Sequence, residues 1–133
     1  MLALAGLSSL LCACDRIREP AEDALGFSEV AFRGRVEGFR DSGNGYRLVI
    51  FKVDRVWKGK IGPTFEMPAV ESDELCWAWP PSMLKTGTEL VVFANHMQGG
   101  THPQEFYPMR CETSLPRDLP DLRKLGRGHK PKG

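Results

Sequence analysis

Four cysteines carry most of the chemistry that this chain of 133 residues offers. Cys12 and Cys14 stand close together near the N-terminus, and Cys76 and Cys111 follow far downstream. In a small exported domain cysteines pair as disulfides, whereas free thiols are typical of reducing compartments. Four cysteines allow three pairings, and spacing alone does not separate them. The compartment and the processing of the N-terminus therefore decide what these thiols do.

The first residues indicate the compartment. Positions 1–11 form an uncharged apolar run about as long as the h-region of a secretory signal and far shorter than the roughly 20 residues that span a bilayer. No basic residue precedes the run, as one does in an ordinary signal. We interpret positions 1–14 as an export signal with its processing site. The alternative is that the run forms a first buried strand or helix.

The processing site follows from the residues around the first two cysteines. Cleavage before Cys14 would place Ala13 and Leu11 at the first and third positions upstream, which resembles a bacterial lipobox. Cys14 would then be lipidated, and two or more acyl chains at about 0.8 kcal/mol per buried methylene would give a stable anchor. Only Cys76 and Cys111 would remain to pair, which stabilises a fold by roughly 2–4 kcal/mol. We expect a periplasmic or cell-surface lipoprotein; the alternative is a secreted protein that begins at Cys12 and forms two bridges.

The rest of the chain reads as a series of strands. Polar and apolar residues alternate from Val30 to Arg40, and Gly34 and Gly38 within this run suit the bends of a small closed barrel. Asn44-Gly45 predicts a hairpin turn. Strands are predicted at 30–40, 46–57, 64–70, 89–95 and 104–111, the third at an edge because it contains Pro68.

Two short helical segments and a tail complete the predicted fold. Pro20 can open a helical turn with Ala21, Ala24 and Leu25 on one side. Near the C-terminus, Asp118 can cap a helix that carries an apolar stripe of Leu119, Leu122 and Leu125 and ends at Gly126. Residues 127–133 are basic and rich in Pro and Gly, and we expect them to be disordered. The alternative is a patch that touches anionic lipid headgroups near the anchor. The sequence predicts one mainly β domain over 15–126, an OB-fold-like, partly open Greek-key barrel with a short C-terminal helix.

Particular sequence segments extend this interpretation to a family. They are VAFRGRV at 30–36, FKVDRVWKG at 51–59, GTELVVFA at 87–94 and Arg110-Cys111. In this order they resemble the strands of bacterial netrin-like proteins, which are related to the tissue inhibitors of metalloproteinases. The resemblance spans most of residues 12–126.

The resemblance includes the cysteines and implies a second function for them. In the animal inhibitors the first cysteine pairs with the third and the second with the fourth, which here would join Cys12 to Cys76 and Cys14 to Cys111. There the free amine and carbonyl of the first cysteine chelate the catalytic zinc of the protease, at the position that such a zinc keeps open. This chemistry needs Cys12 as the first residue, so it excludes lipidation at Cys14. Ala13 lacks the hydroxyl that many animal inhibitors carry at this position.

Two tryptophans next to Cys76 form another candidate site. Trp77 and Trp79 precede Pro80 and Pro81 in a segment without periodicity. They could form an exposed aromatic platform for a peptide or sugar, since tryptophan supplies a large rigid contact area. The alternative is that they cap the barrel.

The composition of the chain and the absence of known motifs exclude several classes of function. With 18 Lys and Arg against 17 Asp and Glu, the net charge is +1 and supplies no global attraction to nucleic acid. His96, His102, Cys76 and Cys111 lack the close spacing of a zinc motif, and no hydrolase or phosphate-loop motif occurs, so we expect no metal, no cofactor and no enzymatic activity. We expect a protein-binding module whose loops around Cys76 and Gly99-Gly100 meet a partner at the cell envelope. The alternative is a metalloprotease inhibitor that acts through Cys12.

Overall fold

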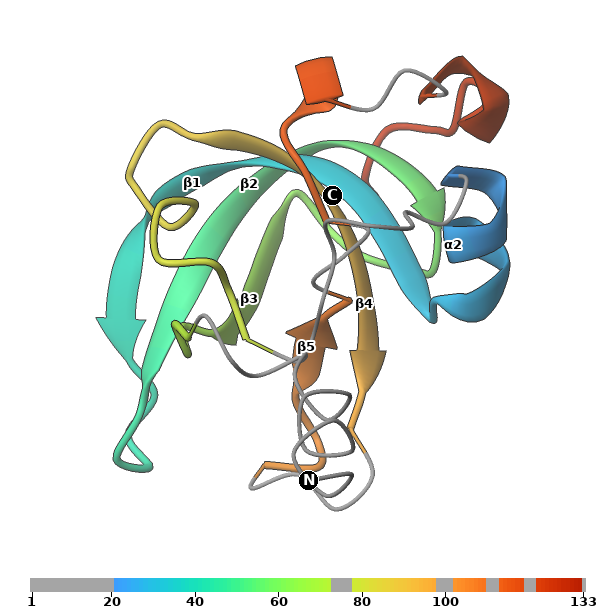
Figure 1. The fold of residues 1–133 in the computed structure, drawn as a ribbon. Coiled ribbons are helices and arrows are strands. Elements are labelled where there is room, and N and C mark those ends of the chain that lie inside the picture. The colour runs from blue at the N-terminus through green and yellow to red at the C-terminus, as the bar shows by residue number, and fades with distance from the viewer. Residues whose placement is uncertain (1–20, 73–77, 98–101, 110–112, 119–121, 133) are drawn as a thin grey trace, which may run out of the picture.

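The computed structural model describes residues 21–72, 78–97, 102–109, 113–118 and 122–132 (Figure 1). Most of the regular structure is β, in agreement with the alternation of polar and apolar residues. The elements in chain order are α2 (Ala21–Phe27), β1 (Val30–Asp41), β2 (Arg47–Lys58), β3 (Thr64–Pro68), β4 (Glu89–His96), β5 (Phe106–Pro108) and the 3-10 helices η1 (Pro116–Asp118) and η2 (Leu122–Leu125). All five predicted strands are present, and the fifth is shorter than predicted.

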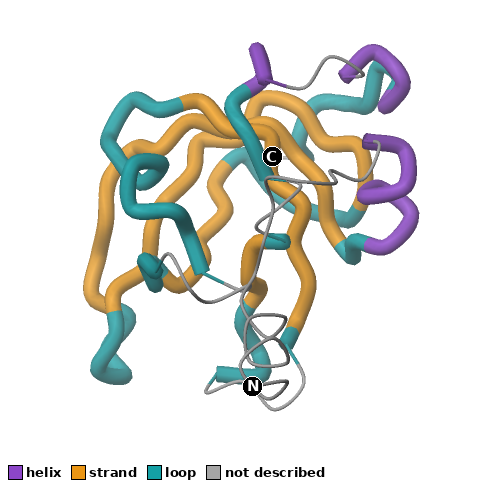
Figure 2. Tube along the Cα trace, in the orientation of Figure 1, coloured by secondary structure: helices purple, strands orange, loops and turns teal. Residues whose placement is uncertain are grey.

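The strands form one antiparallel sheet that curls into an open barrel (Figure 2). Its strand order is β3-β2-β1-β4-β5, so three consecutive strands are followed by a fourth that returns beside the first, which is the Greek-key arrangement. At the open seam, the rings of Phe65 in β3 and Phe106 in β5 lie 5.5 Å apart between centroids. The predicted fold class, a mainly β and partly open barrel, is confirmed.

Strand β1 runs through the middle of the sheet and bends as the sequence predicted. It pairs with β2 from Ala31 opposite Lys58 to Asp41 opposite Arg47. The register shifts between Arg33 and Gly34 and again between Val36 and Gly38. Such bulges increase the local twist and let a sheet curl onto itself. The two glycines therefore mark the bends of the barrel wall.

The barrel interior is filled by side chains from every wall. Val30, Phe32 and Val36 point inward from β1, while Arg35 and Glu37 lie exposed on the outer face. The largest fully buried side chains of the interior are Trp79, Phe32, Phe51, Met67 and Leu90. Phe32 makes edge contacts with Phe51 and with Phe65, at centroid distances of 5.5 and 5.2 Å. This aromatic core fixes the positions of the strands that carry the surface sites.

Helix α2 and the 3-10 helix η2 cover part of the outer face (Figure 1). Ala21 and Ala24 are buried against Ala31, Phe93 and Leu125, so the predicted apolar side of this short helix is confirmed. No helix of the described residues is both long and apolar enough to cross a membrane.

The predicted C-terminal helix takes a tighter form. Within the described residues this region holds the 3-10 turns η1 and η2, and no α-helix. Leu125 is buried and Leu122 half-buried, as the stripe predicted, and Gly126 ends the turn with a φ of 80°. Leu119 lies outside the described residues. Proline has no backbone N–H, and residues 116 and 120 are both prolines. The missing hydrogen-bond donors favour short turns over a continuous α-helix in this stretch.

The prediction of a disordered tail is wrong for residues 127–132. His129 pairs with Val56 in an antiparallel bridge, with N···O distances of 2.8 and 2.7 Å, and the amide of Lys132 donates to the carbonyl of Ile61 at 3.4 Å. The pairing of β3 with β2 ends at Lys52, so the later part of β2 has a free edge on that side. A segment with little to bury can still be ordered when it supplies backbone groups to such an edge.

Candidate functional site

Most of the residues that the sequence singled out lie outside the described residues. This holds for the proposed lipidation site Cys14, for Cys12 and Ala13 of the inhibitory alternative, and for the downstream pair Cys76 and Cys111. Trp77 and the Gly99-Gly100 turn also lie outside them. The predictions on processing, disulfide pairing and zinc chelation therefore stay predictions.

Trp79 is the exception, and its position corrects one expectation. Its side chain is fully buried and packs on Phe51 at a centroid distance of 5.6 Å. The indole Nε1 donates to the carbonyl oxygen of Pro68 at 3.0 Å, which satisfies the polar end of the ring inside the core. A binding platform needs an exposed ring, so the platform interpretation is wrong for Trp79. The alternative, that it closes the barrel, is the one its burial supports.

The segments that lead into the two downstream cysteines are firmly attached. Before and after 73–77, the amide of Trp79 donates to Val70 at 2.7 Å and the amide of Ser72 donates to Trp79 at 3.0 Å. On either side of 110–112, the amide of Thr113 donates to the carbonyl of Met109 at 2.9 Å. The barrel therefore holds the ends of both segments in defined places.

A cluster that the sequence did not predict lies at one end of the barrel, where the β1–β2 hairpin meets the residues that precede β5. We call it the loop-end cluster. Its members are Phe39, Arg40, Tyr46, Arg47, His102 and Glu105. The hairpin turn itself is the predicted one, with positive φ at Gly43 and Gly45. The turn places Tyr46 just before Arg47, the first residue of β2, and Tyr46 contacts residues far along the chain.

Tyr46 joins the two loops. Its ring stacks on the ring of His102 at a centroid distance of 3.8 Å, and its hydroxyl donates to Oε2 of Glu105 at 2.7 Å. The hydrogen bond to a carboxylate favours the protonated phenol and raises the pKa of Tyr46 above its ordinary value. The hairpin and the β4–β5 connection are thus fixed relative to each other.

The two arginines of the cluster have different partners. The Nε of Arg40 lies 2.9 Å from both carboxylate oxygens of Glu66 in β3, and this hydrogen bonding lowers the pKa of Glu66. The guanidinium of Arg47 lies 4.4 Å from the centre of the Phe39 ring and 4.0 Å from Glu71. Arg40 is therefore neutralised at short range, while Arg47 is held over an aromatic face with a more distant carboxylate.

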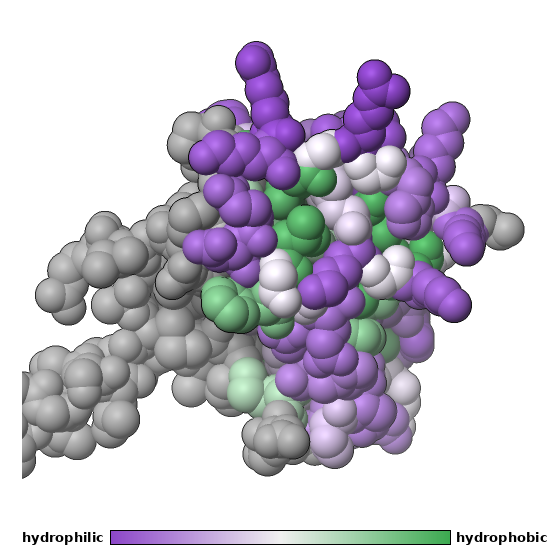
Figure 3. Space-filling model, turned by 90° about the vertical axis from the view of Figure 1, so that its right-hand side faces the viewer, coloured by the Kyte–Doolittle hydropathy of each residue, from purple (hydrophilic) through white to green (hydrophobic). Residues whose placement is uncertain are grey.

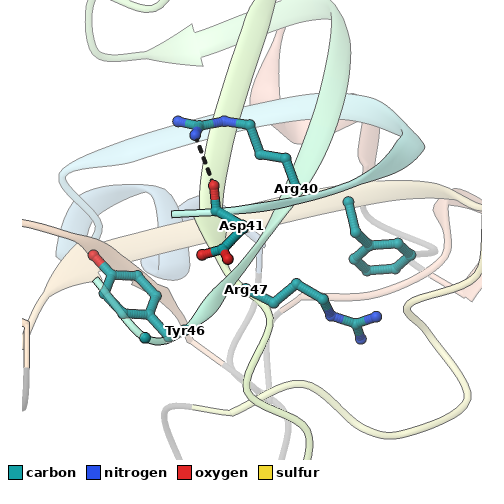
Figure 4. A pocket seen from close by; sticks show the side chains of 6 residues that line it. Arg40, Asp41, Tyr46 and Arg47 are labelled. Atoms are coloured by element: carbon teal, nitrogen blue, oxygen red, sulfur yellow. Dashed lines mark hydrogen bonds between the residues drawn. The ribbon is translucent and has the colours of Figure 1, made fainter. Parts of the chain in front are cut away.

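Beside these side chains the surface is hollowed to a volume of about 620 Å³ (Figure 4). Phe39, Arg40, Asp41, Gly45, Tyr46 and Arg47 line the hollow. The guanidinium of Arg40 bends back to donate to the carbonyl oxygen of Asp41 at 3.0 Å. Arginine side chains on a fixed backbone can donate hydrogen bonds to the carbonyl or carboxylate groups of a bound polypeptide, and the oxygen of a tyrosine hydroxyl can accept one.

The two histidines that the sequence considered as metal ligands have other contacts. His102 stacks on Tyr46, as described above, and Nδ1 of His96 lies 2.9 Å from Oε2 of Glu29. The carboxylate of Glu29 also accepts the backbone amide of His96, and these hydrogen bonds lower the pKa of Glu29. In the part of the chain that the structure describes, no three His, Cys, Asp or Glu side chains gather as a metal site would require.

Comparison of the chain with models of protein families, with curated proteins and with solved structures found no match. The resemblance to netrin-like proteins thus rests on the sequence segments alone. The loop-end cluster had only one sequence signal, the Asn-Gly turn, which places Tyr46 at the start of a strand. Nothing in the sequence connects Tyr46 with His102 and Glu105, because that contact depends on how the sheet curls.

Proposed function

We propose that this chain is an exported, lipid-anchored binding module of the netrin-like type in the bacterial cell envelope, and that it holds a protein partner at the loop-end cluster. The observation that carries the proposal is the contact of Tyr46 with His102 and Glu105, which joins two loops into one surface. A binding surface built on fixed side chains loses less conformational entropy on association than one built on free loops. The module binds and does not catalyse.

The segments that resemble netrin-like proteins lie close together in the sheet. The resembling segments at 30–36, 51–59 and 87–94 fall in or beside β1, β2 and β4, which are neighbours in the sheet. Their apolar residues include Phe32, Phe51 and Val92, which share the barrel core. Segments that pack together in one wall are those in which a family's pattern is expected to be strongest.

The residue types at the loop-end cluster suit a protein partner. Tyrosine and arginine are enriched at the positions that dominate binding energy in protein interfaces. Tyr46 and Arg47 are both held by ring contacts, with His102 and Phe39 respectively. The Tyr46 hydroxyl also donates to Glu105, while the side chain of Arg47 is more than half exposed. We assign the main contacts with the partner to these two side chains.

The alternative function is inhibition of a metalloprotease through an N-terminal Cys12. The two functions differ in one covalent feature, because an acylated Cys14 leaves no Cys12 in the mature chain. Intact mass of the natively expressed protein, from membrane and soluble fractions with and without reduction, separates them. A diacylated species beginning at Cys14 supports the anchored module. A soluble species beginning at Cys12 with two bridges contradicts it and makes protease inhibition the hypothesis to assay.

The binding surface itself is tested by photo-crosslinking in the native envelope. A photoreactive residue replaces Asn44 at the hairpin tip, and the control replaces Lys60, an exposed residue beyond the opposite end of β2. We expect a crosslinked product of defined mass from position 44, absent from position 60 and strongly reduced when Arg47→Ala is added. Equal crosslinking from both positions would contradict a partner site at the loop-end cluster.

A further inference from the structure

A second surface feature lies on the outer face, where the C-terminal segment passes over β1 and β2. It is a groove of about 450 Å³, which we call the arginine groove. It is lined by Arg33, Arg55, Trp57, Leu122, Arg123, Gly126 and Arg127. The net charge of the whole chain is only +1, so four arginines around one hollow are a strong local concentration of positive charge.

Among the residues that the structure describes, only Arg33 of these four arginines has an acidic partner. Arg33 forms a two-pronged pair with Asp54, with N···O distances of 3.0 and 3.1 Å, and this hydrogen bonding raises the pKa of Arg33. Arg55, Arg123 and Arg127 form no ion pair with any described residue. Three cations held around one hollow repel one another, and a bound anion relieves that repulsion.

The wall of the groove is fixed by contacts with the sheet. Nε1 of Trp57 donates to the carbonyl oxygen of Gly126 at 3.0 Å, and the bridge between His129 and Val56 holds the chain just beyond Arg127. The groove exists only because the C-terminal segment is ordered on β2. Arginines on such a fixed wall present planar donor groups of the kind that binds phosphate oxygens in pairs.

The groove adjoins the helix that follows the proposed anchor. The Nζ of Lys124, in η2, lies 3.6 Å from Oε1 of Glu22 in α2. Lys58, next to Trp57, donates to the carbonyl oxygens of Leu25 and Gly26 at 2.8 and 3.2 Å. Figure 3 shows this side of the molecule, with long polar side chains standing around an apolar centre.

Two further features of α2 point to a bilayer. Its last residue, Phe27, is 68% exposed. Ala21 follows Cys14 by seven residues, so even a fully extended chain keeps α2 within roughly 25 Å of that cysteine. Basic residues together with an exposed apolar ring are the combination that binds the headgroup region of a bilayer.

From these observations we propose that the arginine groove binds the phosphate groups of anionic lipids in the membrane that carries the anchor. The inference rests on the proposed lipid anchor and adds to it a second contact, which orients the barrel on the bilayer. Acyl chains at Cys14 fix only one point of the chain, whereas the groove also fixes which side of the barrel faces the lipid. Basic residues near an anionic surface contribute about 1 kcal/mol each.

The test is vesicle binding by the full chain with Cys14→Ser, which cannot be acylated. Binding to vesicles of equal parts phosphatidylglycerol and phosphatidylcholine is measured against vesicles of phosphatidylcholine alone. The groove variant adds Arg55→Gln and Arg127→Gln. The matched control adds Lys85→Gln and Arg117→Gln, which remove the same charge from exposed positions outside the groove. All variants share the same N-terminal segment, so its own affinity for lipid cancels in the comparison.

We expect the groove variant to lose roughly 30-fold in affinity for the phosphatidylglycerol vesicles, from two arginines at about 1 kcal/mol each. The control should lose less than about threefold, and binding to phosphatidylcholine, which reports the shared N-terminal segment, should be the same for all variants. Equal losses in the groove variant and the control would overturn the proposal, as would no loss in either. Binding of inorganic pyrophosphate or of single-stranded DNA that is tighter than binding to the phosphatidylglycerol vesicles, at the same ionic strength, would assign the groove to a soluble phosphate or a nucleic acid and overturn the lipid assignment.

This result is independent of the anchor, because the assay uses an unacylated chain. Intact mass that excludes acylation would remove the proposed function and leave the vesicle result to stand by itself. Unchanged vesicle binding in the groove variant would remove the groove proposal and leave the anchor untouched. Circular dichroism and a urea unfolding curve of each variant establish that the substitutions leave the fold intact.

Discussion

The loop-end cluster and the arginine groove are both polar surfaces, yet they use charge in opposite ways. In the loop-end cluster Arg40 is paired with Glu66, and the Tyr46 hydroxyl is bound to Glu105. In the groove Arg55 and Arg127 have no acidic partner among the described residues. Paired charges hold loops in place, while unpaired charges leave their donors for a ligand. The comparison indicates that the loop-end cluster is organised by its own contacts, whereas the groove keeps arginines without an acidic partner among the described residues.

The two surfaces also rest on different supports. Trp79 lies in the core beneath the loop end, since its partner Pro68 stands opposite Leu48 at the start of β2. The groove depends instead on the backbone pairing of the C-terminal segment with Val56. The loop-end cluster is supported by side-chain packing in the core, and the groove by hydrogen bonds to the edge of β2. Changes directed at one support should therefore leave the other surface largely intact.

The largest effect is expected from Trp79→Ala, which removes the support of the loop end. The substitution opens a large cavity and leaves the carbonyl of Pro68 without its donor, so the free energy of unfolding should fall by about 3–5 kcal/mol. Urea denaturation followed by circular dichroism measures it. Trp79→Phe is the matched control, because it keeps an aromatic ring and loses only the hydrogen bond and part of the volume. If both variants lose the same amount, packing of the indole is not the main support.

A smaller effect is expected from Gly128→Ala, which removes the support of the groove. Gly128 has a φ of 63°, and an added Cβ would lie 2.6 Å from the carbonyl oxygen of Val56. The residue must shift away from β2, at a cost of about 1–3 kcal/mol in the free energy of unfolding. Faster amide exchange at Val56, whose N–H donates to His129, should accompany the loss.

Gly87→Ala is the matched control for that variant. Gly87 also has a positive φ, of 94°, but it lies outside the groove and an added Cβ would meet nothing within 4 Å. Only the backbone strain remains, at roughly 1 kcal/mol. We expect Gly128→Ala to weaken binding to phosphatidylglycerol vesicles and Gly87→Ala to leave it nearly unchanged. Equal losses of affinity would mean that close contact with β2 is not what holds Arg127 in the groove.

The smallest effect is expected from Tyr46→Phe, which keeps the stack on His102 and removes the hydrogen bond to Glu105. The pKa of Tyr46 is raised above its ordinary value of 10.0 by that bond. A raised folded-state pKa contributes stability that is fully present below pH 10 and is lost as the pH rises through the folded-state value. The wild-type chain should therefore lose more stability than Tyr46→Phe between neutral and strongly alkaline pH.

Thermal unfolding of both proteins across that pH range measures the difference. At pH 7 the variant should be only slightly less stable, because the hydroxyl is partly exposed and water replaces its partner. Identical alkaline profiles would mean that the bond between Tyr46 and Glu105 does not contribute in solution. Crosslinking from position 44 should weaken only modestly in this variant, since the ring stays in place.

The sequence by itself determined the architecture of the barrel. Alternating apolar residues gave the strands, Asn44-Gly45 gave the hairpin, and Gly34 and Gly38 marked the bends, because these signals depend on neighbours along the chain. The apolar face of α2 was predictable for the same reason. Trp79 was ambiguous, since a tryptophan beside prolines can lie in the core or on the surface, and only the packed barrel decided for the core.

The tertiary structure alone decided the two surfaces. Tyr46 meets Glu105, and Arg55 comes to lie beside Arg127, through the curl of the sheet and the pairing of a chain end with a distant strand. A net charge of +1 gave no sign of a cationic groove, because composition averages over positions that folding brings together. The sequence did not predict the ordered structure of residues 127–132, for a related reason. A segment with no apolar pattern of its own can be ordered by hydrogen bonds with the backbone of a distant strand. Every residue type has these backbone groups, so the sequence of the segment does not reveal the pairing.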